Sequence, residues 1–537
     1  AVTWGSATAG VSGTVSAANS LVGSTAADGV GNVGVTALTN GNYVVGSQLW
    51  DNGSVLNAGA ATWGNGTTGT VGAVSAANSL VGSTSGDYVC SGGVIKLSNG
   101  NYVVPSSSWD NGAVVDAGAV TWGNGAGGTV GAISATNSLV GSKTSDSVAN
   151  YGVTALKNGN YVVKSQRWDN GLVTDAGAAT WGNGTTGTVG AVSASNSLVG
   201  STASDEVGGT SVTAPVTELS NGNYVVVSMS WNNGAVLDAG AVTWCSGTTG
   251  KTGAVSTSNS LVGSKDFDNV GSHGVTALSN GNYVVGSMRW DNSTVADAGA
   301  ATWGSGTTGV TGAVSATNSL VGSKATDNVG QYIIALSNGS YVVRSPIWDN
   351  STVVDAGAVT WCSGTTAKVG VISSTNSLVG STTNDKVGDP SVTALSNGNY
   401  VVSSPAWTKG AVASAGAATW GNGTTGTVGV VSATNSLVGS TASDQVGYTV
   451  TALSNGNYVV SSTSWDNGAV TDAGAVTWGN GTTGVTGTIS AANSLVGSTA
   501  NDQVSKAGVT ALSNGNYVVQ SNFWSNSGLA GAGAVTW

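Results

Sequence analysis

A six-residue tract, NGNYVV or its near copy NGSYVV, recurs nine times in this 537-residue chain and constrains its fold more than any other feature. Its tyrosines lie 58 to 63 residues apart, and every tryptophan belongs to one of two other motifs in the same register, a WDNG-like motif or AVTW/AATW. Self-similarity at a fixed period is the signature of a repeat architecture. We therefore expect a single repeat domain of nine units over residues 1–537. The tyrosines are Tyr43, Tyr102, Tyr161, Tyr224, Tyr283, Tyr341, Tyr400, Tyr458 and Tyr517.

Each unit reads as a set of short strands. Asn-Gly between VTAL and NYVV predicts a hairpin with a two-residue type I′ turn. VTAL, YVVxS, AVTW and SLVGS are the four predicted strands, and the connection GNGTTGTVGAVSAA is either a loop or a fifth, irregular strand. Four antiparallel strands at a fixed period are typical of a propeller blade. The predicted fold is an all-β propeller of nine four-stranded blades of about 59 residues, with a β-solenoid-like stack as the alternative.

Composition excludes several functions. Only 7% of residues are charged, the net charge is -11, and the 14 Lys and Arg residues are scattered, so binding to nucleic acid is not expected. Apolar runs are far shorter than the roughly 20 residues that span a bilayer, so no membrane insertion is expected. A single histidine, His273, lies in a variable loop, and the serines have no paired base. We predict no enzyme activity and no cofactor.

The WDNG-like motif supplies one large aromatic ring per unit. Because tryptophan buries about 150–250 Å² when packed, we expect these rings to form the contacts between units. The alternative is a row of stacking platforms for sugar rings. The residues are Trp50, Trp109, Trp168, Trp231, Trp290, Trp348, Trp407, Trp465 and Trp524.

Aspartates are as regular as the aromatic residues. Short carboxylates commonly fix turns by accepting backbone N–H bonds, and this is the predicted role. Calcium binding is the weaker alternative, because no D-x-[DN]-x-[DN]-G loop is present. The aspartates of the SxxxDxV position are Asp28, Asp87, Asp146, Asp205, Asp268, Asp327, Asp385, Asp444 and Asp502.

Two features do not follow the repeat. Cys90, Cys245 and Cys362 are irregularly placed, and in a ring they would be too far apart for intramolecular disulfides, which leaves free thiols or intermolecular bridges open. The four residues after YVV differ in nearly every unit and include Arg344. They are either sites where individual contacts are tuned or simple drift on a solvated rim.

Three phrases in a fixed order carry a resemblance. NSLVGSTAxDxVG, GVTALSNGNYVV and DAGAVTWGNGTTG resemble repeats of very large bacterial surface proteins described as filamentous-haemagglutinin-like or adhesin-like. The resemblance implies export, an extracellular or cell-surface location and a structural or adhesive role, and it assigns no catalytic residues. The filamentous haemagglutinin fold is itself a β-helix.

The chain begins and ends on the same tetrapeptide, so AVTW-type strands number ten against nine of each other kind. We expect the surplus strand to pair across a joint between molecules by strand addition, or to mark a cut from a longer array. The predicted function is a secreted structural protein, a subunit of a surface fibre, matrix or adhesin that self-associates into filaments. The alternative is a multivalent carbohydrate-binding propeller whose partners are surface glycans. The candidate assembly residues are Ala1, Val2, Thr3, Trp4, Ala534, Val535, Thr536 and Trp537.

Overall fold

A computed structural model describes residues 1–209 and 215–537, and these residues form an all-β repeat protein. Strands of two to five residues alternate with turns, and the described ranges contain no helix. Accordingly, none of their segments is a helix with the length and apolar character needed to cross a bilayer. The all-β class and the repeat character predicted from the sequence are confirmed.

One sheet illustrates how each unit folds. β2 (Gly34–Ala37), β3 (Tyr43–Ser47), β4 (Ala60–Gly64) and β6 (Ser79–Val81) pair in antiparallel order. These are the four predicted strands. The fifth strand of the sheet, β10 (Gly131–Ala132), comes from the next unit and pairs with β6 in parallel. The segment left open as a loop or an irregular strand is therefore a two-residue strand that hydrogen-bonds to the preceding unit.

The other units repeat this pattern. The first strands are β2, β7 (Ile95–Lys96), β12 (Val153–Ala155), β17 (Val216–Glu218), β22 (Val275–Ala277), β27 (Tyr332–Ala335), β32 (Val392–Ala394), β37 (Thr449–Ala452) and β42 (Gly508–Ala511). The second strands, which begin at the NGNYVV tyrosine, are β3, β8 (Tyr102–Ser106), β13 (Tyr161–Ser165), β18 (Tyr224–Ser228), β23 (Tyr283–Ser287), β28 (Tyr341–Ser345), β33 (Tyr400–Ser404), β38 (Tyr458–Ser462) and β43 (Tyr517–Ser521).

The third strands carry AVTW. They are β4, β9 (Ala119–Gly123), β14 (Ala178–Gly182), β19 (Ala241–Cys245), β24 (Ala300–Gly304), β29 (Ala358–Cys362), β34 (Ala417–Gly421), β39 (Ala475–Gly479) and β44 (Ala534–Thr536). The short parallel strands are β5 (Gly72–Ala73), β10, β15 (Gly190–Ala191), β20 (Gly253–Ala254), β25 (Gly312–Ala313), β30 (Gly370–Val371), β35 (Gly429–Val430) and β40 (Gly487–Thr488). The SLV strands are β1 (Leu21–Val22), β6, β11 (Ser138–Val140), β16 (Ser197–Val199), β21 (Leu261–Val262), β26 (Leu320–Val321), β31 (Leu378–Val379), β36 (Ser436–Val438) and β41 (Leu495–Val496).

The hairpin between β2 and β3 has a different turn from the predicted one. The Gly41 N–H donates to the Leu38 carbonyl at 3.2 Å, and the Leu38 N–H donates to the Asn42 carbonyl at 2.8 Å. Among the turn residues only Gly41 has a positive φ, of 87°. The loop is therefore the three-residue kind, a type I turn closed by a left-handed glycine, and the two-residue type I′ prediction is wrong.

The hydrophobic core lies between successive units. In one cluster Leu38, Val44 and Ala61 of one unit pack with Tyr102 and Trp109 of the next. The same arrangement recurs further along, where Leu395 and Val401 pack with Tyr458 and Trp465. Each unit therefore depends on its neighbour for burial, as in other stacked repeat proteins.

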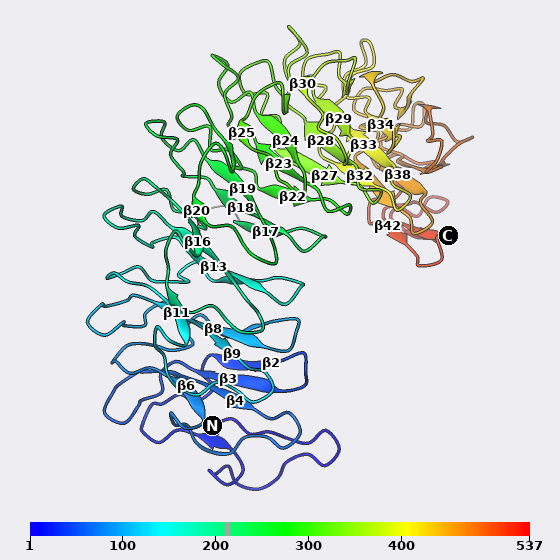
Figure 1. Cartoon of the computed structure of the whole chain (residues 1–537). Helices are drawn as coiled ribbons and strands as arrows, with labels where there is room; N and C mark the ends of the chain where they lie inside the picture. The colour runs from blue at the N-terminus through cyan, green and yellow to red at the C-terminus, as the bar shows by residue number, and fades with distance from the viewer. Residues whose placement is uncertain (210–214) are drawn as a thin grey trace. The chain divides into compact units, whose positions relative to one another are not determined.

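The chain divides into two compact units, one of residues 1–269 with 309–312 and the other of residues 270–308 with 313–537. Within the first unit the sheets follow one another in chain order, from blue to green in Figure 1. Among residues 1–209 and 215–537, the sheets of neither unit close into a barrel or a propeller, so the nine-bladed ring is not confirmed. Parallel pairing such as that of β6 with β10 adds a strand of one unit to the sheet of the preceding unit, whereas propeller blades are separate four-stranded sheets.

Candidate functional site: the contact faces between repeats

A backbone carbonyl is the centre of the polar contact between neighbouring units. The Gly125 oxygen, in the GNG loop of one unit, accepts hydrogen bonds from Asn40 Nδ2, Asn42 Nδ2 and Trp63 Nε1 of the preceding unit, each at 2.9 Å. We call this arrangement the carbonyl clamp. Two of its donors come from the NGN turn and one from the AVTW strand, so the two most regular motifs of the sequence meet at a single atom of the next unit.

The clamp recurs along the chain. Asn42 also accepts from the Gly66 N–H of its own unit at 3.0 Å, so its amide holds its own GNG loop and the following one together. The equivalent acceptors, each with the Trp and two Asn that donate to it, are Gly184 (Trp122, Asn99 and Asn101), Gly247 (Trp181, Asn158 and Asn160), Gly364 (Trp303, Asn280 and Asn282) and Gly481 (Trp420, Asn397 and Asn399).

One clamp lacks a donor because NGNYVV is replaced by NGSYVV. Within the described part of the chain, Gly423 accepts from Asn338 and Trp361 alone, since Ser340 stands where the second asparagine would be. Ser340→Asn should raise the free energy of unfolding by about 1 kcal/mol, because it adds hydrogen bonds to a site that is already built. Urea unfolding of the two proteins would measure the difference. The exposed Ser374→Asn is the matched control, and an equal gain from it would contradict the clamp explanation.

The WDNG-like tryptophans lie in the core. Eight of them are 2–4% exposed and pack against strands of neighbouring units, as the packing interpretation predicts. Trp524, near the end of the chain, is half-buried. The proposed stacking of sugars on these rings stays a prediction, and it would require the core to open.

The SxxxDxV aspartates hold turns from the inside. Asp87 is fully buried, and its Oδ2 accepts from the backbone N–H groups of Ser83 and Thr84 at 2.7 and 2.8 Å. Its Oδ1 accepts from the Asp110 N–H at 2.9 Å, and Asp110 Oδ1 in turn accepts from the Asp116 N–H at 2.8 Å. Backbone donors thus occupy the carboxylate oxygens that would bind calcium. In residues 1–209 and 215–537, no group of three or more His, Cys, Asp or Glu residues is placed to hold a metal ion.

Lowering the pH from 7 to about 4.5 should not destabilise the protein. Burial raises the pKa of five of these carboxyls above the ordinary value, although backbone N–H bonds lower it; they are Asp87, Asp146, Asp327, Asp385 and Asp444. At Asp28 burial also raises the pKa, but hydrogen bonds from Thr25 and other partners outweigh it and the net shift is downward.

The sign follows from proton linkage. A carboxyl whose pKa is higher in the folded state gives stability that is complete below its unfolded pKa, about 3.9, and that is lost as the pH rises through the folded value. Asp238 is a sixth carboxyl whose pKa burial raises, whereas the lowered pKa of His273 costs stability as the pH falls. With six raised carboxyls against Asp28 and His273, the urea midpoint at pH 4.5 should equal or exceed that at pH 7. A steep fall of the urea midpoint as the pH is lowered from 7 to 4.5 would contradict this assignment of the pKa shifts.

The three cysteines are free and buried. Burial raises the pKa of each thiol to about 12, so the reactive thiolate is disfavoured. The intermolecular bridges left open by the sequence would need these sites to become exposed.

The candidate assembly residues lie in incomplete sheets. Val2 exchanges backbone hydrogen bonds with Leu21 at 2.9 Å, and Trp4 Nε1 donates to the Gly66 carbonyl at 3.1 Å. At the other end β44 pairs only with β43, and Val535 and Trp537 are 75% and 81% exposed. β41 lies at the edge of a four-stranded sheet, where β6, β11 and β36 each have a parallel partner.

A family model described as a repeat of unknown function (DUF5650) matches the chain from end to end. The matched segments are residues 1–32, 37–91, 96–150, 155–209, 218–272, 277–331, 335–389, 394–448, 452–506 and 511–537.

The chain belongs to this family.

The DUF5650 segments follow one another along the chain as a tandem array. The match therefore supports the repeat character that the predicted resemblance implied. Nothing in the match links DUF5650 to filamentous-haemagglutinin-like adhesins, and no curated protein matches the chain. The segments at 1–32 and 511–537 correspond to the later and the earlier part of one DUF5650 repeat, and they overlap in the tetrapeptide AVTW. The sequence pattern marks these terminal strands, but it does not mark the carbonyl clamp, because the clamp acceptor is a backbone atom.

Proposed function

We propose that this protein is a structural, non-enzymatic repeat protein located outside the cell or at the cell surface. It would be a subunit of a fibre, matrix or adhesin whose copies join through their terminal β-strands. The resemblance of its repeats to those of large bacterial surface proteins supports the location. The observation that carries the proposal is the contact between successive units, which recurs along the array and joins different faces of neighbouring units.

A joint of this kind follows the geometry already used between units. The contact between successive units is heterologous, because the clamp donors face one way and the Gly carbonyl the other. A heterologous interface that does not close generates a filament. β41 would gain a parallel partner from residues 13–14 of another copy, which occupy the position of β5 one unit earlier. Trp478, 44% exposed, would gain the carbonyl acceptor that Trp420 has in Gly481.

One residue opposes a seamless joint. Ala7 stands where the other units have the GNG glycine. At Gly66, a Cβ would overlap the Gly41 carbonyl oxygen of the NGN turn. In a joint, Ala7 would meet the Gly515 turn of the neighbouring copy in the same way, so that turn or loop has to shift. Ala7 therefore weakens the association without removing its strand pairing.

The test measures the mass of the purified chain by light scattering over a range of concentrations, with negative-stain imaging. We expect concentration-dependent linear assemblies. Deleting residues 1–14, which removes the strand that would pair with β41, should abolish them while the circular dichroism stays unchanged. Ala7→Gly should strengthen association several-fold, whereas Ala9→Gly, an exposed change in the same loop, should not.

Two results would overturn the proposal. A chain that remains monomeric at every concentration, or assemblies that survive deletion of residues 1–14, would exclude a joint through these strands. Isolated closed discs would instead support the nine-bladed propeller, in which the terminal strands pair within one chain. That closed form is the finer fold prediction, and the same images test it.

A further inference from the structure

A cluster that does not repeat lies on the second compact unit, around β27. Tyr332, Ile333 and Ile334 stand where four of the other units have Gly-Val-Thr before Ala-Leu, and Arg344 occupies the variable position of β28 directly across from Tyr332. These residues border an open cavity of about 380 Å³, which His273, Gln331, Ser391 and Val392 also line. It combines an apolar floor with several hydrogen-bonding groups.

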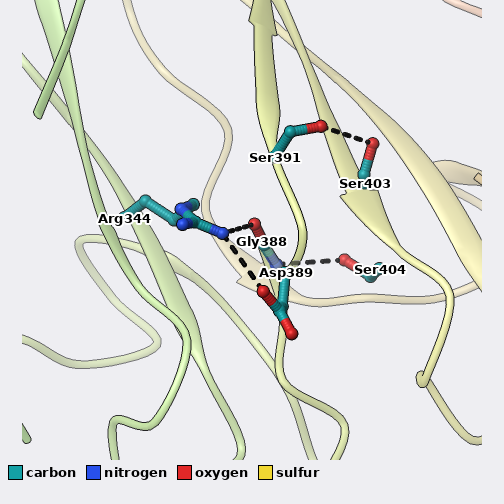
Figure 2. A network of polar contacts seen from close by, with 6 residues as sticks. All are labelled: Arg344, Gly388, Asp389, Ser391, Ser403 and Ser404. Atoms are coloured by element: carbon teal, nitrogen blue, oxygen red, sulfur yellow. Dashed lines mark hydrogen bonds and ion pairs between the residues drawn. The ribbon is translucent and has the colours of Figure 1, made fainter. Parts of the chain in front are cut away.

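Arg344 is held rigidly at this cavity. Its guanidinium carbon lies 3.8 Å from the centre of the Tyr332 ring, and its side chain is 8% exposed. Nη1 donates to the Gly388 carbonyl at 2.9 Å and to Asp389 Oδ1 at 3.3 Å, as Figure 2 shows. A Cβ at Gly388 would lie 3.0 Å from Arg344 Cγ, so a glycine at this position leaves room for the arginine side chain. Because the guanidinium is fixed by stacking and by two acceptors, little conformational entropy is lost when it binds a further group.

The guanidinium keeps donors to spare. Both of its hydrogen bonds leave from Nη1, and among the described residues Nε and Nη2 have no acceptor. Nε and Nη2 form an edge of the fork that matches a carboxylate with two parallel bonds. Asp389 contacts the arginine through one oxygen and its side chain is 51% exposed, so it does not fill that edge.

The charge of the cavity selects among anions. Arg344 is the one formally cationic lining residue, because burial lowers the pKa of His273 and keeps its imidazole neutral at pH 7. With Asp389 beside it, the site fits a monoanion better than a dianion such as phosphate. His273, packed edge-on to Tyr332 with ring centres 5.9 Å apart, can bond hydroxyl or carbonyl groups of a ligand. The Ser391 hydroxyl donates to Ser403 Oγ at 3.4 Å and can accept from a ligand hydroxyl.

We propose that the cavity between β27 and β32 is a binding site for a small organic carboxylate, whose carboxylate pairs with Arg344 and whose body lies against Ile333, Ile334 and Val392. The site is independent of the terminal strands, so it stands or falls separately from the proposed assembly. No role was predicted for His273, and the structure places it at this cavity.

The test uses the full chain and calorimetric titration with four probes. Glucuronate and benzoate share the carboxylate but differ in the body, hydroxylated in one and apolar in the other, while glucose and inorganic phosphate lack a carboxylate. We expect at least one carboxylate to bind at least tenfold more tightly than glucose and phosphate. The stronger of the two carboxylates identifies the body that the cavity prefers.

Three variants distinguish a binding site from a purely structural role, in which Arg344 only holds neighbouring units together; we call this role a latch. Arg344→Ser, which copies Ser403 of the next unit, should weaken carboxylate binding at least tenfold with unchanged circular dichroism. Asp389→Asn should strengthen it several-fold, because it removes a competing carboxylate. Arg167→Ser, an exposed arginine of the other unit, is the control for loss of charge and should change nothing.

The opposing outcomes are distinct. If neither carboxylate binds, or if phosphate or glucose binds as well, the ligand class is wrong. If Asp389→Asn weakens binding, or if Arg344→Ser leaves it unchanged, Arg344 is only a latch between units. The Asp389 variant keeps the proposal falsifiable even if Arg344→Ser disturbs the fold, because Asp389 is exposed.

Discussion

Asp87→Ala should lower the free energy of unfolding by about 2–4 kcal/mol, a large loss for a single substitution. Asp87 is fully buried and accepts three backbone N–H bonds, from Ser83, Thr84 and Asp110. Alanine would leave these donors without an acceptor, and each unsatisfied buried donor costs about 1–3 kcal/mol. Removal of the buried charge offsets part of this cost, since burial already raises the pKa of Asp87.

Hydrogen exchange gives the sharpest measurement, because repeat proteins open locally as well as globally. The amides of Ser83, Thr84 and Asp110 should exchange faster in Asp87→Ala, and the urea midpoint should fall. Asp110→Asn is the matched control, because Asn232 occupies the same position in another unit and still accepts from the Asp238 N–H at 2.8 Å. If Asp110→Asn were as damaging, or if the three amides kept their protection, the carboxylate would not be the turn-fixing group.

The strand content was predictable because the repeat restates the same information nine times. VTAL, YVV, AVTW and SLV each recur with apolar residues between turn residues. All four are strands in the structure, and they pair in their order along the chain. The aspartate turns were predictable for a similar reason, since a carboxylate at a fixed offset in every unit indicates a local backbone partner. The Asp87 contacts confirm this.

Contacts between units were harder to predict. Gly72 and Ala73 have no strand-like pattern of their own, and they pair because the preceding Leu21 and Val22 present a free edge. The clamp acceptor Gly125 is a backbone carbonyl, which the sequence marks only as a recurrent glycine. The closure of the array depends on the small rotation between successive units, and residue patterns within one unit do not determine it.

The cavity beside Arg344 was only partly predictable from the sequence. Variation after YVV marked Arg344 as different from its equivalents, but variation alone does not separate a tuned contact from drift. The change of Gly-Val-Thr to Tyr-Ile-Ile was the second signal, because the hairpin register places Tyr332 opposite Arg344. Two departures from the repeat that face each other indicate a local site more strongly than either one alone.

Gly125→Ala should lower the free energy of unfolding by about 3 kcal/mol, a loss comparable to that expected for Asp87→Ala. A Cβ at this position would overlap the carbonyl oxygen of Gly100 in the NGN turn of the same unit. To relieve the overlap, the GNG loop must move and carry its own carbonyl away from Asn40, Asn42 and Trp63. Each of the three hydrogen bonds contributes about 0.5–1.5 kcal/mol.

Gly127→Ala is the matched control two residues away. No atom lies within 4 Å of a Cβ at Gly127, and its φ is not positive. Alanine there should be neutral or stabilise by about 0.4–1 kcal/mol through the unfolded chain. Urea unfolding of the two variants would measure the contrast, and equal effects would contradict the close approach at Gly125.

The same measurement bears on assembly, because Ala7 is the alanine that the chain already has at the Gly125 position. A strong effect of Gly125→Ala means that Ala7 strains any joint built like the contact between units, and Ala7→Gly should then lengthen the assemblies. If Gly125→Ala were tolerated, the loop would be able to shift at little cost, and Ala7 would not limit the joint. The free energy of unfolding lost in Gly125→Ala thus predicts how strongly Ala7→Gly should promote assembly.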